Sequence, residues 1–478
     1  MSNVIATFYN FGETGANKGR VRLISSSGST PAVVSGSGVD ITNTDPIAFY
    51  FNGGSSTGTR VLLVQRRYNA SYVQIFCYLS VYDPSTWTQT VAPNTAAYQY
   101  SDSTDLLNIY NLNSPGGTAS GTLYGADYSA GRVFKLVHGK TGGTETLTLD
   151  TPYYQFAATG SGATAYSVDT VFNTESSVDY VYAVAQQYAV SGSGSDPANY
   201  TYYNSIIVKL DAGTLAPVTG GGPSATLAPN VFDLQYYGGN LYATALGGAQ
   251  WYGTGTSYPN TVKWNYASRI QKVTTGLTVT DLVRPANASE TGSTYNNDKF
   301  DIRALGLVSD GTAYILTGSY YTESAYNYLL NGRLWKVSAS TLFAASNALI
   351  SSLSGATAIE SLADLPGFMW ALLPANDLSK VWGMLGDNLT IYDATGLVGD
   401  PIDAANASEW VDGSGDPIGS PAFNAISLAT PSISKLKAGA APASIKSVRG
   451  FVHPLLASRA GIKPEDFDKF ISAHFAKQ

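Results

Sequence analysis

Hydrophobic and polar residues alternate over short stretches along most of the chain, and clusters of turn residues interrupt the alternation. Alternation with a period of two predicts half-buried β-strands, and Asp-, Gly- or Pro-containing turns between such strands predict hairpins. One strand-and-turn element occurs seven times, beginning at Gly19, Cys77, Gly131, Ser205, Ser268, Gly332 and Asp387. A repeat of this kind predicts one array of similar units rather than several unrelated domains.

A second element precedes each copy except the first: an apolar strand, a turn, and a strand that often carries an aromatic residue. It is clearest in "FDLQYYGGNLYATAL" from Phe232 and "FDIRALGLVSDGTAYILTG" from Phe300. The two elements and the strand after the turn give about four strands per unit of roughly 55–75 residues, which is typical of propeller blades with long loops. We therefore predict an all-β fold, a seven-bladed β-propeller over residues 1–430.

The two ends of this region predict how the ring closes. The N-terminal stretch Val4–Phe11 supplies a second strand without an inner strand before it, and Phe423–Leu428 is an inner strand without a blade after it. Pairing these two segments would complete the first blade and remove the exposed strand edges.

The repeated pattern is D-[apolar]-x-[apolar], a turn, Y-[apolar], and then R-[apolar]-x-K-[apolar]. It resembles bacterial propeller repeats of the NHL and YVTN (YncE-like) kind over about residues 1–430. The resemblance is to a style of repeat. It implies the propeller fold and leaves function open, because those families include surface proteins, binding scaffolds and enzymes.

Composition changes after about Pro431. We predict a linker over residues 431–443 and a helical tail over residues 444–478, in which Phe467, Phe470, Ile471 and Phe475 recur at helical spacing. Residues 431–478 carry eight Lys or Arg and three acids, a net charge of +5, which leaves −12 of the total of −7 for the remainder. A basic tail on an acidic ring predicts docking on its own ring, or on another copy or assembly partner.

The rest of the composition excludes some classes of function. The acidic ring argues against nucleic-acid binding, and no apolar run is long enough to span a membrane. The only cysteine, Cys77, lies in the apolar run "QIFCYLSVY" and is predicted to be a buried thiol. Few charges and many Ser, Thr, Asn and Tyr residues favour an exported protein, in the periplasm, at the cell surface or outside the cell; a cytoplasmic protein is the alternative.

The propeller region has few residues for histidine-based catalysis. His138 is the only histidine in the propeller region, and we interpret it as a solvated turn residue. A more regular feature is a set of polar residues, 60 to 68 residues apart, at the starts of the predicted inner strands: Asp45, Asp105, Asp169, Asp233, Asp301, Asp364 and Asn424. They predict a ring at one mouth of the channel, either as a site for a cation or polar ligand or as local caps of backbone N–H groups.

Three long Tyr-rich loops between second and third strands should project from one face. Their aromatic residues are candidates for carbohydrate or protein contacts, or for packing among themselves: Tyr200, Tyr202, Tyr203, Trp251, Tyr252, Trp264, Tyr320, Tyr321 and Tyr326. Asp412 and Asp416 alternate as in a calcium-binding loop, but the acid that ends such a loop is missing. No cofactor is predicted; Ca²⁺ is the weak alternative.

Three functions are compatible with these features. The preferred interpretation is a non-enzymatic, exported binding or structural propeller that displays its Tyr-rich loops to a carbohydrate or protein. The second is a carbohydrate-active lyase or hydrolase that uses Asp, Glu or Tyr at the channel mouth, and a pair of carboxylates about 5–10 Å apart would favour it. The third is a subunit of a surface assembly, joined through the tail.

Overall fold

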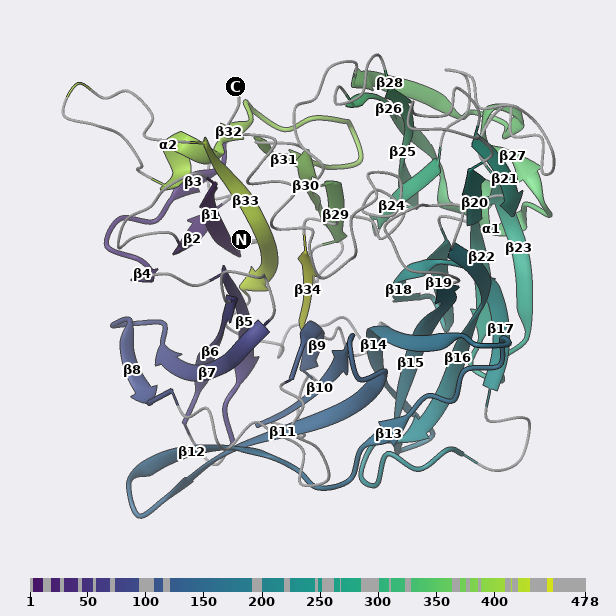
Figure 1. The fold of residues 1–478 in the computed structure, drawn as a ribbon. Coiled ribbons are helices and arrows are strands. Elements are labelled where there is room, and N and C mark those ends of the chain that lie inside the picture. Colours follow the sequence, from purple (N-terminus) through teal and green to yellow (C-terminus); the bar gives the residue numbers. More distant parts are fainter. Residues whose placement is uncertain are drawn as a thin grey trace.

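The chain folds into a seven-bladed β-propeller (Figure 1). The computed structural model describes residues 3–11, 19–25, 30–41, 45–54, 57–68, 74–93, 107–114, 121–190, 200–218, 224–245, 248–251, 262–266, 268–284, 301–308, 311–322, 328–362, 370–374, 379–385, 388–408, 414, 420–429 and 445–449. Within these ranges the strands of each blade run outward from the axis in chain order and pair antiparallel, except that the innermost strand of the first blade comes from the C-terminal part of the chain and the outermost pair of the fifth blade is parallel. The seven predicted repeats therefore correspond to seven blades.

The first three blades hold the strands from β1 to β13. Blade 1 consists, from the axis outward, of β33 (Ser420–Ala429), β1 (Asn3–Phe11), β2 (Gly19–Ser25), β3 (Ala32–Val33) and β4 (Val39–Ile41). Blade 2 consists of β5 (Asp45–Asn52), β6 (Thr59–Tyr68), β7 (Gln74–Asp83) and β8 (Thr88–Val91). Blade 3 consists of β9 (Ile109–Ser114), β10 (Thr122–Asp127), β11 (Arg132–Thr141), β12 (Thr144–Leu149) and β13 (Tyr154–Gln155).

Blades 4 and 5 follow the same plan. Blade 4 consists of β14 (Thr164–Glu175), β15 (Val178–Val190), β16 (Tyr200–Asp211) and β17 (Ser224–Pro229). Blade 5 consists of β18 (Val231–Tyr237), β19 (Asn240–Ala245), β22 (Arg269–Thr274), β23 (Val279–Arg284) and β27 (Ala348–Leu349). The hairpin β20 (Gly248–Trp251) and β21 (Val262–Tyr266) lies in the connection between β19 and β22.

Blades 6 and 7 complete the circle. Blade 6 consists of β24 (Asp301–Leu307), β25 (Thr312–Thr322), β26 (Tyr328–Ser338) and β28 (Thr357–Leu362), with helix α1 (Ala339–Ala344) and a 3₁₀ turn (Ile350–Ser352) after the third strand. Blade 7 consists of β29 (Trp370–Pro374), β30 (Val381–Leu385), β31 (Asn388–Tyr392) and β32 (Ile402–Asp403). Helix α2 (Ala404–Ser408) precedes the closing strand, and neither helix has the length or apolarity needed to cross a bilayer.

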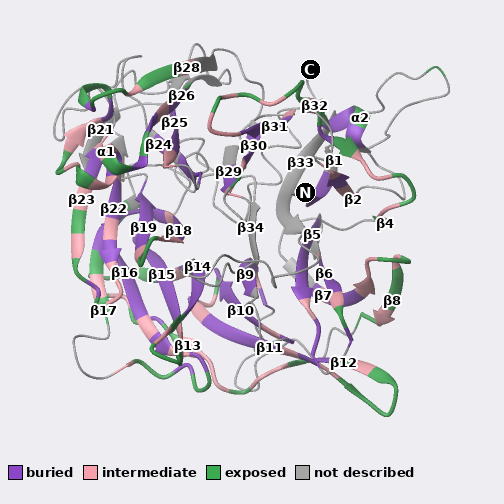
Figure 2. Cartoon of the chain, turned by 180° about the vertical axis from the view of Figure 1, so that it is seen from behind, coloured by how far each residue is buried: buried purple, intermediate pink, exposed green. Residues whose placement is uncertain are grey.

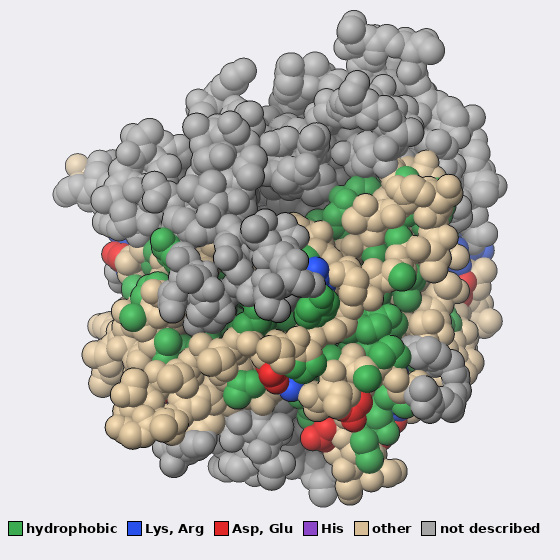
Figure 3. Space-filling view, turned by 60° about the horizontal axis from the view of Figure 1, so that its bottom comes forward, with side chains coloured by type: hydrophobic (Ala, Val, Ile, Leu, Met, Phe, Trp, Pro, Cys, Tyr) green, Lys and Arg blue, Asp and Glu red, His purple; other side chains and the backbone are tan. Residues whose placement is uncertain are grey.

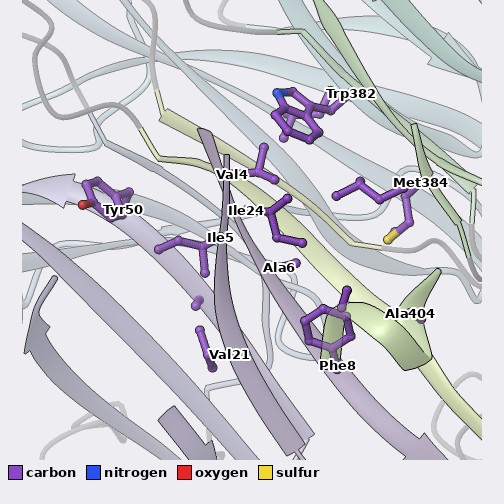
Figure 4. Close-up of a cluster of buried hydrophobic side chains, with 14 of the residues drawn as sticks. Val4, Ile5, Ala6, Phe8, Val21, Ile24, Tyr50, Trp382, Met384 and Ala404 are labelled. Carbon is purple, nitrogen blue, oxygen red and sulfur yellow. The ribbon is translucent and has the colours of Figure 1, made fainter. Parts of the chain in front are cut away.

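The predicted closure of the ring is confirmed. The closing strand β33 pairs antiparallel with β1 from Asn3↔Ala429 to Phe11↔Ser420. The C-terminal part of the ring thus provides the inner strand of the blade that the N-terminus begins. Figure 4 shows the core behind this joint, where Val4 and Ile24 of blade 1 lie near Trp382 and Met384 of blade 7.

The core consists of apolar layers between neighbouring blades. Separate clusters join blades 2 and 3, blades 3 and 4, blades 4 and 5, and blades 5 and 6, in addition to the one around blade 1. Figure 2 shows the middle strands buried and the outer strands partly exposed. Cys77 is fully buried in the layer between blades 2 and 3, as predicted. In the tilted view of Figure 3, charged side chains are sparse on the visible rim.

The Tyr and Lys of the repeated pattern link blades 3, 4 and 6 to the blade that follows each of them. Tyr124 on β10 lies directly opposite Lys135 on β11. The Tyr124 hydroxyl donates to the Ala212 carbonyl at 2.9 Å, and Lys135 Nζ donates to the Gly213 carbonyl at 2.8 Å. Both carbonyls belong to the turn after the third strand of blade 4. The pair therefore binds two backbone groups that have no partner within their own sheet.

Two further blades repeat this contact. Tyr182 and Lys209 are paired across β15 and β16, and both lie within hydrogen-bond distance of the Thr275 carbonyl, at 3.0 and 3.3 Å. Both also donate to the Glu175 carboxylate of their own blade. In blade 6, Tyr314 and Lys336 are paired and donate to the carbonyls of Asp393 and Ala394. The signature that resembles NHL and YVTN repeats thus has a packing role in this chain.

Blade 5 keeps the residue pair and replaces the hydrogen bond. Tyr242 lies opposite Lys272, but helix α1 occupies the place of the turn in blade 6. The Tyr242 ring stacks on Phe343 of that helix, with ring centroids 4.4 Å apart. An aromatic contact therefore substitutes for the carbonyl contact at this joint.

The described part of the tail is a strand and not the predicted helix. Residues Ile445–Arg449 form β34, so the predicted helical tail over residues 444–478 is wrong for these five residues. The segment forms a strand because unpaired edges of two inner strands are available to it. The linker and residues 450–478, with Phe467, Phe470, Ile471 and Phe475, lie outside the described residues.

Candidate functional site

The site predicted from the sequence is the end of the channel where the inner strands begin, called the mouth below. Every blade repeats the same order of antiparallel strands from axis to rim. Inner strands therefore all begin at one end, and connections between second and third strands lie at that same end. The acids and the Tyr-rich connections of blades 4, 5 and 6 consequently belong to one face.

Among the described residues, Asp169, Asp233 and Asn424 lie inside their inner strands and not at the strand starts that the sequence predicted. Asp45 and Asp301 are the first residues of β5 and β24, and Asn424 lies in β33. The side chains of these three are outside the described residues. Asp169 and Asp233 lie in β14 and β18, and both are buried. Asp105 and Asp364 are outside the described residues.

β-Bulges show that these residues occupy different levels along the axis. A bulge immediately precedes Asp169 in β14 and Asp233 in β18, so the two acids are equivalent. In β9 the equivalent residue is Asn111. In β24 the bulge follows Ile302, which makes Ala304 the equivalent residue and puts Asp301 three positions nearer the strand start. Regular spacing in the sequence therefore does not give a single ring.

Asp169 connects three inner strands. Asn111 Nδ2 of β9 donates to Asp169 Oδ1 at 2.6 Å, and the Leu234 N–H of β18 donates to Asp169 Oδ2 at 2.7 Å. The Thr170 N–H adds a third bond at 2.8 Å. Hydrogen bonds from N–H donors to a carboxylate are short and strong, so Asp169 fixes the positions of the strands that donate to it. Capping of backbone N–H groups, one of the two predicted roles, is thus what Asp169 does.

Amide side chains continue this polar layer around the axis. Asn113 Nδ2 donates to the Thr170 carbonyl of blade 4 at 2.8 Å, and Gln235 Nε2 donates to the Leu305 carbonyl of blade 6. Among the described residues, the side-chain oxygens of Asn111, Asn113 and Gln235 are buried without a hydrogen-bond partner. Buried amide oxygens of this kind retain acceptor capacity for a polar group near the axis.

The two loop tyrosines whose side chains are described pack into the protein. Tyr202 is buried, and its ring lies 5.9 Å from that of Tyr188, which stacks on Tyr166 at 4.4 Å. The Tyr203 hydroxyl donates to the Ser161 carbonyl at 3.0 Å. The base of the loop over residues 191–199 is therefore anchored by tyrosines.

The other predicted contact residues are placed only by their backbone, or not at all. Tyr200, Trp251, Trp264, Tyr320 and Tyr321 lie in strands, with side chains outside the described residues. Tyr252, Tyr326, Asp412 and Asp416 lie outside them altogether. Within the described part of the chain, no group of three or more His, Cys, Asp or Glu side chains is arranged to hold a metal ion.

His138 is not the solvated turn residue that the sequence suggested. It lies in β11 and is 2% exposed, packed against Phe51 and Gly54 of blade 2. The hairpin turn is further on, at Gly142 and Gly143, whose positive φ values suit a two-residue turn between Thr141 and Thr144. The double glycine was the signal that could have placed this histidine inside the strand.

A buried ionic cluster surrounds His138. The Gly54 N–H donates to His138 Nδ1 at 3.2 Å, so Nε2 carries the proton and donates to Glu145 Oε2 at 3.2 Å. Arg60 of β6 binds both oxygens of Glu145, at 2.9 and 2.6 Å. The Arg60 hydrogen bonds are the main reason that the pKa of Glu145 falls to about 2, while burial lowers the pKa of His138. The cluster joins two blades through a neutral histidine and an ion pair.

The channel itself contains the C-terminal strand. β34 pairs antiparallel with β33 of blade 1 at Ala425↔Arg449, Ile426↔Val448 and Ser427↔Ser447. On its other side it pairs with β9 of blade 3 at Ile445↔Ser114 and Lys446↔Asn113. Figure 1 shows β34 near the centre of the ring. Because β34 runs antiparallel to both inner strands, the chain leaves it at Arg449 in the direction of the mouth.

The arrangement of the strands establishes the fold class, a seven-bladed β-propeller. No family model matches the sequence, and no curated protein does. The resemblance to NHL and YVTN repeats therefore extends to the fold and has no support at the level of sequence families.

Several solved structures are similar. A periplasmic gluconolactonase of Pseudomonas aeruginosa is 12% identical, with a TM-score of 0.44, over 90% of this chain and 99% of that one. A luciferin-regenerating enzyme is 12% identical, with a TM-score of 0.33, over 75% and 97%. Regucalcin from Agrobacterium tumefaciens, described as calcium-binding, is 12% identical, with a TM-score of 0.30, over 72% and 93%. The first two descriptions name enzymes. At these identities the likeness is one of fold.

Proposed function

We propose that this propeller is a non-enzymatic, exported binding protein that holds a carbohydrate or protein ligand on the loops around its mouth. The observation that carries the proposal is the position of β34 between β33 and β9. A strand in the channel takes up the space along which a small substrate would approach the axis. Ligand contact then falls to the connections between second and third strands.

The anchoring of these connections supports the proposal. Stacked tyrosines at the base of the loop over residues 191–199 fix where it leaves the ring, with Tyr188 and Tyr202 both buried. Loops on a rigid base lose little conformational entropy when they bind, and tyrosine offers a large contact area with few rotatable bonds. The ring thus supplies a fixed platform for variable loop tips.

The role of Asp169 also supports it. Both oxygens of this carboxylate accept hydrogen bonds from neighbouring inner strands. A carboxylate used in this way holds the ring together and is poorly placed to be a catalytic acid or base. Asp45 and Asp301, nearer the strand starts, are the acids that we propose for polar contacts with a ligand.

The enzymatic alternative is a carbohydrate-active lyase or hydrolase at the same mouth. Enzymes among the propellers of similar fold agree with this class. In such an enzyme two carboxylates would flank the scissile bond. A single experiment distinguishes the two functions because binding without turnover and binding with turnover leave different products.

The test combines ligand binding with product analysis. The purified chain is screened on a glycan array, and each ligand found is incubated with the protein and followed by NMR. A loop variant, Tyr200→Ala with Trp251→Ala, removes two of the candidate aromatic contacts and should bind at least tenfold more weakly, whereas the rim variant Gly139→Ala should bind normally. Turnover that disappears in Asp45→Asn or Asp301→Asn would replace the proposal by the enzymatic alternative. Unchanged binding by the loop variant would refute the location.

A further inference from the structure

The channel-facing edges of β33 and β9 form a slot that accepts an extended strand. β34 fills this slot through backbone pairing on both sides and links blades 1 and 3 into one continuous sheet across the axis. It also contacts β5 and β29, so inner strands of four blades surround it. Main-chain pairing provides affinity for any extended segment of suitable length and direction.

The connection between β33 and β34 is much longer than their geometry requires. Extending the register from Ser427↔Ser447 puts Ala429 opposite Ile445, where a hairpin of two to five residues would suffice. Fifteen residues, 430–444, separate them instead. Extended, such a segment spans about 50 Å. A connection several times longer than necessary lowers the local concentration of β34 at its own slot by roughly the three-halves power of the length, or about eightfold for a fourfold increase.

Charge favours association between copies as well. Residues 431–478 carry +5 and the remainder −12, and two of the tail's bases, Lys446 and Arg449, lie within β34 itself. The tail of one copy is therefore attracted to the ring of another. A strand that moves from its own slot to an identical slot makes the same contacts, so chain length and concentration decide between the two.

We infer that β34 is an exchangeable strand and that the slot between β33 and β9 receives the C-terminal strand of a second copy of this chain. The ring of one copy then accepts the strand that the tail of another copy donates. This association goes beyond the proposed ligand binding and does not depend on it. Since donor and acceptor surfaces differ, the contact is head-to-tail, and repeated exchange gives rings or linear chains of subunits.

Cross-linking across the slot tests this inference. In a Cys77→Ser background, Ser427→Cys and Ser447→Cys place two thiols at directly paired positions of β33 and β34. Cα atoms of paired residues in antiparallel strands lie about 4.5–5.5 Å apart, within the range for a disulfide. Under mild oxidation at high protein concentration, non-reducing electrophoresis should show a ladder of dimers and larger species. Analytical ultracentrifugation of the untreated wild-type chain should show the same series and its dissociation on dilution.

Two controls make the outcome decisive. The first control, Ser427→Cys with Lys446→Cys, moves one thiol by one residue and so to the opposite face of the strand. It should form few disulfides, either within one chain or between chains. Deletion of residues 440–478 should leave a folded monomer at every concentration, as checked by circular dichroism. A disulfide found only within single chains would overturn the inference, because β34 would then stay in its own ring. Absence of any disulfide in the matched pair would overturn it too, because the slot would not hold β34.

Discussion

The ion pair between blades 2 and 3 provides a quantitative test of how neighbouring blades are joined. Glu145 binds the Arg60 guanidinium through both oxygens, and the two side chains are only 6% and 9% exposed. Glu145→Gln keeps the shape and removes the charge. The guanidinium then stays buried beside a neutral amide, with Asp83 as the nearest remaining carboxylate, at 3.8 Å.

Removing one partner of a buried ion pair costs about 3–5 kcal/mol, because the other charge is left uncompensated. The contact with Asp83 puts the expected loss near the lower end, at about 3 kcal/mol. An unfolding entropy of about 2.1 cal/mol/K per residue gives about 1 kcal/mol/K for the whole chain, so the melting temperature should fall by about 3 °C.

Urea unfolding followed by circular dichroism, together with calorimetry, measures both quantities. The control is the double variant Arg60→Met with Glu145→Leu, which replaces the pair by apolar side chains of similar size. It should recover most of the loss, because neither charge then remains to be buried. A single variant that costs under about 1 kcal/mol, or a double variant no more stable than the single one, would refute the reasoning.

Acid should abolish the difference between wild type and Glu145→Gln. The pKa of Glu145 is lowered from 4.5 to about 2, so the folded state holds this proton less tightly than the unfolded state. The stabilisation by the carboxylate is therefore complete above about pH 4.5 and is lost as the pH falls towards 2. The two unfolding curves should converge over this interval, and a constant difference would contradict the assignment of the pKa to this ion pair.

The remaining predictions concern single contacts. Burial lowers the pKa of His138 below its ordinary 6.5, so wild-type stability should begin to fall as the pH drops below about 6.5, and His138→Gln should flatten this part of the profile. Tyr124→Phe removes the hydrogen bond to the Ala212 carbonyl and should cost about 1–3 kcal/mol by urea unfolding. Gly125→Ala would place a methyl group 2.2 Å from a buried phenyl ring and should cost about 1–3 kcal/mol, whereas Gly139→Ala, 3.9 Å from its nearest neighbour, should be neutral by calorimetry.

The fold was predictable because its information is local and repeated. Each blade can be recognised from alternating polar and apolar residues and from turns within about 60 residues. Val4–Phe11 lacks an inner strand and Phe423–Leu428 lacks a blade, so together they predict how the ring closes. What the repeated residues do was not predictable. Tyr124 and Lys135 act on a turn that lies 88 and 78 residues further along the chain, and only the register that puts them side by side shows that they act together.

The levels of the channel acids were not predictable, for a different reason. A β-bulge sets two residues of one strand against one of its partner, and this local count shifts every later residue by one position. Asp169 and Asp301 begin similar-looking segments, yet the bulge falls before the first and after the second. Spacing of 60 to 68 residues cannot reveal such a shift, because loop lengths vary by more than the shift itself.

The strand β34 shows that the secondary structure of the tail depends on the strand edges that it contacts. Closing a propeller pairs every blade internally, but the innermost strand of each blade still presents one unpaired edge to the channel. The edges of β33 and β9 run in the same direction, so one antiparallel strand can pair with both. Ser444 before Ile445 and Gly450 after Arg449 are common helix-capping residues, so the sequence of this segment does not exclude a helix. Pairing with two unpaired strand edges outweighs this helical tendency. The closing of the ring by β33 therefore creates the site that the following residues occupy, which the sequence of the tail alone could not reveal.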